Sequence, residues 1–232
     1  MSRPTKPVAL VTGTAQGIGR AIADQLEADG LEVLRTDRDE MDVTDVASVE
    51  QFVATAPPID ILVNSAGGVL GQVHQPLEAV TDVDWQAIID VNLTGTFHCV
   101  RAVVGGMKHR GWGRIVTISS GAGRSVSLTG IQAYASAKAA QISFTRQMAH
   151  ELGPYSITVN AIAPGFVLSN PTTIAQWESY GEEGQRRLVE GIALRRLGQA
   201  ADIAHGVSFF VSERASWITG QTLSIDGGSA LF

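Results

Sequence analysis

The chain has 232 residues, enough for one α/β domain or two small ones with a substantial buried core. An apolar fraction of 44% and 25 glycines are typical of a compact enzyme rather than of a disordered or fibrous chain. The net charge of −6, with no run of Lys and Arg, argues against a nucleic-acid partner, and a single cysteine, Cys99, excludes an internal disulfide.

The start of the chain shows no targeting signal. Residues 1–7 contain two basic side chains but no apolar segment of the kind found in signal peptides. We also expect no apolar stretch long enough to span a bilayer. The sequence therefore predicts a soluble, cytoplasmic protein with no membrane partner.

The first half of the chain alternates short apolar runs with helical patterns. Residues 7–12 form a β-branched apolar run that predicts a buried strand, and a glycine-rich turn follows at 13–19. Further strands are expected at 31–36 and 59–63, and helices at 20–29, 45–56 and 84–110. Thr81 or Asp82 can cap the long helix, and Gly111 ends it.

The second half repeats this alternation. Strands are expected at 114–118, 156–162 and 222–225, with a helix from about Tyr134 to Gly153 and another that Asp202 caps. Residues 166–197 predict a loop with short helices, a small lid over the active site. The pattern calls for an α/β fold: a Rossmann-like, doubly wound parallel sheet flanked by helices. No linker or repeat divides residues 1–232, so we expect a single dinucleotide-binding and catalytic domain.

The glycine-rich turn has the position and composition of a dinucleotide site. Gly13 permits a tight turn, Gly17 lets the backbone approach a pyrophosphate at a helix N-terminus, and Gly19 allows close packing of helix on strand. Its spacing, G-x-x-x-G-x-G, differs from the G-x-G-x-x-G of Rossmann dehydrogenases. No G-K-[ST] follows, so the turn is not a P-loop.

Asp37, at the end of the second expected strand, bears on which dinucleotide binds. An acid about 20 residues beyond the glycines can hold both adenosine ribose hydroxyls. It also repels a 2′-phosphate, which favours NAD over NADP. Arg38 follows immediately and could pair with that phosphate, so NADP stays possible. Gln16 adds no positive charge, and the alternative for Asp37 is a solvated turn residue.

Tyr134 and Lys138 are the candidate chemical groups. They stand four residues apart on an expected helix and so share a face. A nearby ammonium stabilises phenolate, which predicts that the pKa of Tyr134 lies below its ordinary value of roughly 10. Such a phenol can exchange a proton with an alcohol or a ketone near neutral pH. The alternative, which spacing alone favours, is an ordinary helix with a surface lysine and a core tyrosine.

Taken together, these motifs resemble the short-chain dehydrogenase/reductase family over residues 8–228. Thr12-Gly13-x-x-x-Gly17-Ile18-Gly19 resembles the family's cofactor turn, and Tyr134-x-x-x-Lys138 its catalytic core. Further matches are Asn92 in the catalytic tetrad, Asp42-Val43 at the adenine, Asn64-x-Ala66-Gly67 beside the sheet, and Pro164-Gly165-x-Val167 beside the nicotinamide. The resemblance implies cofactor contacts by Gly13, Gln16, Gly17, Ile18, Gly19, Asp37, Arg38, Asp42, Val43, Asn64, Ala66, Gly67, Tyr134, Lys138, Pro164, Gly165, Val167 and Ser169.

The sequence departs from the family pattern at the catalytic serine. The family places it thirteen residues before the tyrosine, where this chain has Gly121. Ser120 is the expected match, with one extra residue in the following loop, and Ser119 is the alternative. Many members also carry a second asparagine where this chain has Ser65, and the connection from residue 37 to residue 42 is short.

The resemblance implies reversible hydride transfer between NAD(H) and a secondary alcohol or ketone. Ser120 would bond the substrate oxygen, and Tyr134 would take or give the proton. Lys138 would lower the pKa of the tyrosine and reach the nicotinamide ribose, while Asn92 would hold a water that links Lys138 to solvent. No His/Cys/Asp cluster has metal-ligand spacing, so no metal is expected.

Alternatives for the function remain open. One is an NADPH-dependent 3-oxoacyl-thioester (acyl-carrier-protein) reductase, and another is a non-catalytic dinucleotide-sensing protein on the same fold. Phe166, Trp177 and Tyr180 could pack an apolar or ring-shaped substrate, and the lid offers no clear basic clamp for a phosphate or carboxylate. Relatives commonly form tetramers, so a homo-oligomer, tetramer or dimer, is expected.

Overall fold

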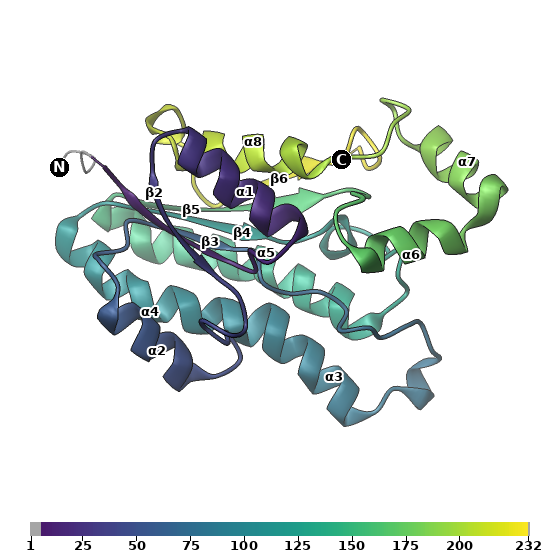
Figure 1. Ribbon diagram of the computed structural model, residues 1–232, viewed down its shortest axis with the longest axis horizontal. Coiled ribbons are helices and arrows are strands. Elements are labelled where there is room, and N and C mark those ends of the chain that lie inside the picture. The colour runs from purple at the N-terminus through teal and green to yellow at the C-terminus, as the bar shows by residue number, and fades with distance from the viewer. Residues whose placement is uncertain (1–5, 232) are drawn as a thin grey trace.

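The computed structural model describes residues 6–231 (Figure 1). Its strands are β1 (Val8–Thr12), β2 (Glu32–Thr36), β3 (Ile61–Asn64), β4 (Gly113–Ile118), β5 (Ile157–Pro164) and β6 (Thr222–Ile225). All six are parallel and form one sheet in the order β2-β1-β3-β4-β5-β6. The chain goes to one side of β1 for β2 and returns to the other side for β3. That change of direction is where doubly wound sheets bind ligands, and it confirms the expected fold class.

The central strands are buried along their whole length. Every residue of β1, β3, β4 and β5 is buried. Val11 of β1 pairs with Arg35 of β2 on one side and with Val63 of β3 on the other. Continuous apolar runs suit such strands because helices cover both faces of a parallel sheet.

Helices cover the sheet in two layers (Figure 1). On one face, α1 (Gly17–Ala28) and α8 (Ala200–Val211) pack Leu26 and Phe210 into a shared apolar cluster. On the other face lie α2 (Val46–Thr55), α4 (Gly95–Arg110) and α5 (Gln132–Leu152). Short 3₁₀ helices are η1 (Leu77–Ala79), η3 (Gly121–Gly123), η4 (Gly153–Tyr155) and η5 (Glu213–Ala215).

The expected helix at 84–110 is longer and is interrupted. It comprises α3 (Asp82–Ile89), a π-helical turn η2 (Asp90–Thr94) and α4. Thr81 caps it, since its hydroxyl accepts the Asp84 amide at 3.1 Å. An 18-residue stretch of this 29-residue helix reaches a mean hydropathy of 1.2, so by length and composition it could cross a bilayer, which corrects our expectation. Buried helices of soluble proteins pass the same test, and α4 packs Val103 and Met107 into the core.

The lid segment forms two helices, α6 (Pro171–Ser179) and α7 (Gly181–Gly191), which extend beyond the carboxyl ends of the strands (Figure 1). One isolated parallel bridge joins Val167 to Gly198. Asp202 takes part in capping α8, as expected, but from the third helical position of a capping box and not as the N-cap residue. Gln199 is the N-cap of α8, and Asp202 is the third helical residue, whose carboxylate accepts the Gln199 amide at 2.9 Å.

The prediction that residues 1–7 contain no signal peptide lies largely outside the described residues, because the structure does not describe residues 1–5. The single-domain division of residues 1–232 and the cytoplasmic location stay predictions.

Candidate active site

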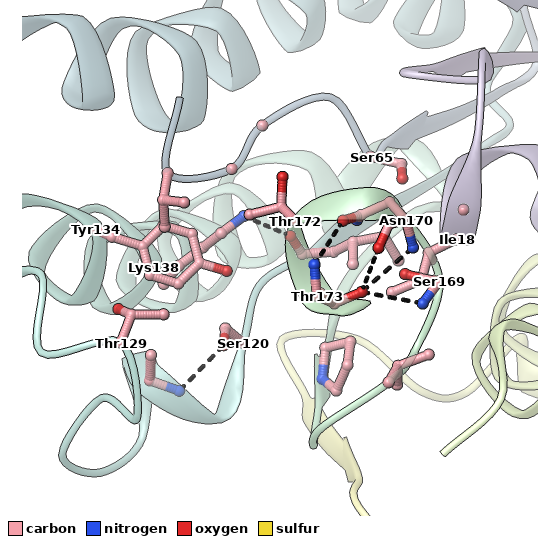
Figure 2. Close-up of a pocket in the computed structure, with 18 of the residues that line it drawn as sticks. Ile18, Ser65, Ser120, Thr129, Tyr134, Lys138, Ser169, Asn170, Thr172 and Thr173 are labelled. Atoms are coloured by element: carbon pink, nitrogen blue, oxygen red, sulfur yellow. Dashed lines mark hydrogen bonds between the residues drawn. The ribbon is translucent and has the colours of Figure 1, made fainter. Parts of the chain in front are cut away.

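A cavity of about 730 Å³ opens at the carboxyl ends of the strands. The glycine turn after β1 forms one end, where Ile18 and Ser65 face Ser169 and Asn170 (Figure 2). The other end holds Tyr134 and Lys138 of α5, with Ser120 and Thr129 nearby (Figure 2). Of the predicted site residues, all line this cavity except Asn64 and Asn92.

The glycine turn leaves room for a ligand at the start of α1. Gly13 adopts φ +72°, and a Cβ there would lie 2.9 Å from the Ala66 amide nitrogen. Gly17 adopts φ +62°, and its Cβ would lie 3.0 Å from the Ser169 carbonyl oxygen. Gln16, the N-cap residue, makes no side-chain capping bond to the first turn of α1. This cradle suits the pyrophosphate of a dinucleotide, which the amides and dipole of a helix N-terminus attract.

Asp37 lies at the adenosine side of the cavity. Its two carboxylate oxygens accept the amides of Ala15, at 2.9 Å, and Arg38, at 2.8 Å. Each oxygen keeps a lone pair for a further donor. The carboxylate is therefore held in place and can accept hydrogen bonds from ribose hydroxyls.

Asp42 and Val43 line the same side of the cavity. Burial alone would raise the pKa of Asp42, but the Thr44 hydroxyl and amide donate to it at 2.7 and 2.9 Å, and the Arg38 guanidinium also acts on it. The net result is a pKa below the ordinary value. The charge of Arg38 thus acts on Asp42 within the chain.

Asn64 supports the sheet from inside. It is buried and does not line the cavity, and its Nδ2 donates to the Thr117 hydroxyl at 3.3 Å. The structure therefore gives Asn64 a place behind the cavity wall, and its expected contact with the cofactor stays a prediction. The turn after it does reach the cavity, where the Thr12 hydroxyl accepts the Ser65 and Ala66 amides at 3.1 and 3.0 Å.

Tyr134 and Lys138 share one face of α5, as their spacing predicts. The Lys138 ammonium nitrogen lies 5.6 Å from the centre of the tyrosine ring and donates to the Ile118 carbonyl at 2.9 Å. Burial lowers the pKa of Lys138 to about 7. Burial also raises the pKa of Tyr134, although a hydrogen bond with the Ser120 hydroxyl acts in the opposite direction. The expected lowering of the Tyr134 pKa is therefore wrong, because desolvation of the phenol outweighs the charge of a lysine that is itself buried.

The two candidate serines have different surroundings. The Ser119 hydroxyl is buried and donates to the Lys138 carbonyl at 2.8 Å. The Ser120 hydroxyl accepts the Ala122 amide at 3.1 Å and lines the cavity near Tyr134 (Figure 2). Ser119 therefore fastens the strand end to α5, whereas Ser120 is placed to meet a ligand.

Asn92 lies in the π turn η2, fully buried behind the cavity wall. Its side chain accepts the Gly68 amide at 3.0 Å and donates to the Gly68 and Ile88 carbonyls, each at 2.9 Å. Its own carbonyl accepts the Gln141 amide at 2.6 Å and the Thr96 hydroxyl at 2.7 Å. A carbonyl has two lone pairs. The arrangement makes the Asn92 side chain a clamp on the cavity wall, and its expected role in holding a water stays a prediction.

The segment after β5 closes the cavity from the lid side. The Gly165 amide donates to the Ile225 carbonyl at 3.1 Å, and the Asn170 side chain caps α6 by accepting the Thr173 amide at 3.0 Å. Asn170, Thr172 and Thr173 also line the cavity and were not among the predicted site residues. Asn170-Pro171 is a helix-start signal, N-cap followed by proline, and it could have revealed them.

The substrate side of the cavity is aliphatic and carries few charges. Leu70, Val126 and Leu128 line it and are exposed. Among the residues that the structure describes, Arg38 and Lys138 are the only basic residues that line the cavity as a whole. Within residues 6–231, no group of three His, Cys, Asp or Glu side chains could hold a metal ion.

Comparisons with known proteins identify the family of this chain. A family model described as enoyl-(acyl carrier protein) reductase matches residues 40–230. The chain is 36% identical to the 3-oxoacyl-[acyl-carrier-protein] reductase FabG of Salmonella typhimurium, over 95% of this chain and 96% of that protein.

Two solved structures are similar over almost the whole chain. One is a 3-oxoacyl-[acyl-carrier protein] reductase from Brucella melitensis with bound NAD, at 33% identity, a TM-score of 0.81, and coverage of 97% of this chain and 91% of that one. The other is a variant of actinorhodin polyketide ketoreductase with NADPH, at 29% identity, a TM-score of 0.87 and full coverage of both chains. Fold, family model and near-complete relatives agree, and the chain belongs to the short-chain dehydrogenase/reductase family of oxidoreductases.

Proposed function

We propose that this chain is an NAD(H)-dependent oxidoreductase that interconverts a secondary alcohol and a ketone. The observation that carries the proposal is one cavity with a glycine cradle for a dinucleotide at one end and Ser120, Tyr134 and Lys138 at the other. Such a cavity can hold a nicotinamide ring and a substrate carbon side by side.

When bound, the nicotinamide supplies or accepts the hydride, which carries both electrons of the carbon–hydrogen bond. At neutral pH the buried Tyr134 keeps its proton and can give it to the ketone oxygen, and in the reverse direction the phenolate takes the proton from the alcohol. The Ser120 hydroxyl bonds the substrate oxygen and also stabilises the phenolate. Lys138, in its charged form, stabilises that phenolate further.

Two features support NAD over NADP. The Asp37 carboxylate is fixed at the adenosine side and would repel a 2′-phosphate. The charge of Arg38, the group that could attract the phosphate, acts on Asp42. One of the similar structures carries NAD and the other NADPH, so a comparison of activity with NADH and NADPH decides this part of the proposal.

A second candidate is a 3-oxoacyl-thioester reductase, which the name of the FabG relative favours. The aliphatic cavity wall at Leu70, Val126 and Leu128 would accommodate an acyl chain. The scarcity of basic lining residues supports instead a small uncharged ketone or alcohol over a substrate held by its phosphate. A non-catalytic dinucleotide sensor is the remote third candidate.

A panel of secondary alcohols, sugars, steroids and 3-oxo esters, assayed with both nicotinamides, tests the proposal. We expect Tyr134→Phe to lower kcat at least about a hundredfold while NADH binding, measured by fluorescence, stays unchanged. Tyr155→Phe, at an exposed tyrosine outside the cavity, is the matched control. Near-normal turnover in Tyr134→Phe would remove Tyr134 from the mechanism. No turnover in the unaltered chain despite tight NAD binding would favour the sensor.

A further inference from the structure

A buried polar cluster lies behind the cavity, outside the residues that line it. Gln141 of α5, one turn beyond Lys138, is 1% exposed. Its Nε2 donates to the Asn92 carbonyl at 2.6 Å and to the Thr96 hydroxyl at 2.9 Å. The Thr96 hydroxyl donates in turn to the same Asn92 carbonyl. Gln141 thereby ties α5 to the π turn η2 and to α4.

The π turn explains why a side chain is needed at this point. In a π turn the backbone hydrogen bonds skip one residue further than in an α-helix, so carbonyls lose their regular alignment with amide donors. A buried carbonyl without a donor costs free energy. Gln141 supplies a donor to the Asn92 carbonyl from a neighbouring helix, and this fixes the orientation of the Asn92 peptide.

The side chain of Asn92 connects the π turn to the cavity wall. Its carboxamide holds both the amide and the carbonyl of Gly68. A Cβ on Gly67 would lie 2.5 Å from the Asn92 Oδ1 and 3.6 Å from the Lys138 Nζ. Gly67 and Gly68 both line the cavity, with φ values of +146° and +143°. Hydrogen bonds from Gln141 to Asn92, and from Asn92 to Gly68, thus hold the cavity wall beside Lys138.

We propose that Gln141 is a positioning residue: through the Asn92 carbonyl it fixes the side chain that clamps the Gly67–Gly68 wall beside Lys138. The hold of Gln141 on the Gly67–Gly68 wall can be tested without enzyme activity, whereas the effect of Gln141 on turnover rests on the proposed function.

Two variants of Gln141 separate the donor from the shape of the side chain. Gln141→Leu removes the donor at every pH. Gln141→Glu has the same shape and can donate to the Asn92 carbonyl only while its carboxyl is protonated. Burial raises the pKa of such a carboxyl, so the bond would be present at low pH and lost as pH rises. The ionisable groups on the packed elements include Tyr134 and Lys138 on α5, Asp90 on η2, which bonds Gln86, and His98 and Cys99 on α4, of which His98 bonds the Val43 carbonyl.

Hydrogen exchange at the Gly68 amide is the direct measurement, since Asn92 accepts that amide and no turnover is required. We expect exchange at least about tenfold faster in Gln141→Leu. In Gln141→Glu, exchange should match the unaltered chain at low pH and become faster as pH rises. Thr145→Val is the control, because Thr145 lies one turn further on α5, is equally buried and makes no side-chain hydrogen bond to Asn92.

Kinetics provide the second readout. We expect kcat to fall about tenfold to a hundredfold in Gln141→Leu, with little change in NADH affinity, and the pH profile of Gln141→Glu to lose activity at its alkaline side. Unchanged Gly68 exchange in both Gln141 variants would overturn the proposal, as would identical behaviour of Thr145→Val. If Gln141→Leu does not fold, Gln141→Glu carries the test. If the unaltered chain shows no turnover, the proposed function is contradicted. Hydrogen exchange at the Gly68 amide then decides the role of Gln141 by itself.

Discussion

Lys138 combines almost complete burial with the absence of an acidic partner in the described hydrogen bonds. It is 4% exposed, and its ammonium nitrogen donates to one backbone carbonyl, that of Ile118. Burial without a carboxylate disfavours the charged form, which explains the lowered pKa of about 7. Lys138 therefore gains or loses its proton close to physiological pH.

This shift predicts a pH-dependent stability. Lys138 has a pKa of about 7 in the folded chain against an ordinary value of 10.5, so between these values the unfolded chain holds a proton that the folded chain does not. The free energy of unfolding then rises with pH across this window and, from this group, is lowest at about pH 7 and below. Lys138→Met removes this contribution. We expect the Tm of Lys138→Met minus that of the unaltered chain to be largest near pH 7 and to shrink as pH rises.

Thermal melts of both chains across this pH range check the prediction, with Lys108→Met as a control at a partly exposed lysine. A difference in Tm that stays constant with pH in Lys138→Met would contradict it.

The sequence identified the reactive side chains but not their energetics. The four-residue spacing of Tyr134 and Lys138 was sufficient to place them on one face of α5. The direction of the Tyr134 pKa depends instead on burial by distant segments, which local spacing does not contain. Similarly, Ser119 and Ser120 are equivalent by position along the chain. Their surroundings differ because α5 lies beside the end of β4, where the Ser119 hydroxyl donates to the Lys138 carbonyl.

Among the elements, the loop between η3 and α5 controls the substrate side of the cavity. Its hydroxyl groups bond one another: the Ser127 and Thr129 hydroxyls lie 2.8 Å apart, and the Thr129 hydroxyl accepts the Ile131 amide at 3.3 Å. Val126, which precedes Ser127, is 92% exposed, and Leu128, between Ser127 and Thr129, is 63% exposed. The loop therefore satisfies its own polar groups and presents aliphatic side chains to whatever enters the cavity.

Leu128→Asp tests this element. A carboxylate at this wall would oppose apolar substituents, so we expect kcat/KM for ketones with long alkyl or ring substituents to fall about tenfold or more, and that for small ketones to change little. Steady-state kinetics over a series of ketones of increasing size measures the effect. Val83→Asp, at an exposed valine outside the cavity, is the control. Equal losses for small and large ketones would contradict the role of this loop.

Elements with strong periodicity were predictable, and those shaped by tertiary contacts were not. The strands at the centre of the sheet match their apolar runs within a few residues. The π turn at Asp90–Thr94 was not predictable, because its offset hydrogen bonds are stabilised by Gln141 from another helix. The start of α6 at Asn170-Pro171 was readable in local chemistry but lies in a segment without clear apolar periodicity.

At the scale of the whole molecule, β6 forms one edge of the sheet and, within residues 6–231, pairs only with β5. Exposed apolar side chains belong to this region: Trp217 is 98% exposed, with Phe209 on α8 and Leu223 on β6 also exposed. An open sheet edge and a fully exposed tryptophan favour association with a second copy of the chain.

We predict a homo-oligomer in which this edge is covered. Light scattering should give a mass that is a multiple of 24.5 kDa, and Trp217→Glu should lower it. Val73→Glu, at an exposed valine elsewhere on the surface, should leave the mass unchanged. A monomeric mass for the unaltered chain would contradict the prediction.

The π turn in the long helix also limits how the length of this chain can change. A π turn contains one residue more than the corresponding α-helical turn. Removing a residue from the regular α-helix at the start of α4 would rotate the rest of α4 by about 100°, because an α-helix has about 3.6 residues per turn, and Val103 and Met107 would then leave the core. Removing a residue from Asp90–Thr94 would instead convert the π turn into an ordinary α-helical turn, so that α4 could keep its buried face. The π turn is therefore the point at which this helix can lose a residue with the least effect on the core, at the expense of the Asn92 contact with Gly68.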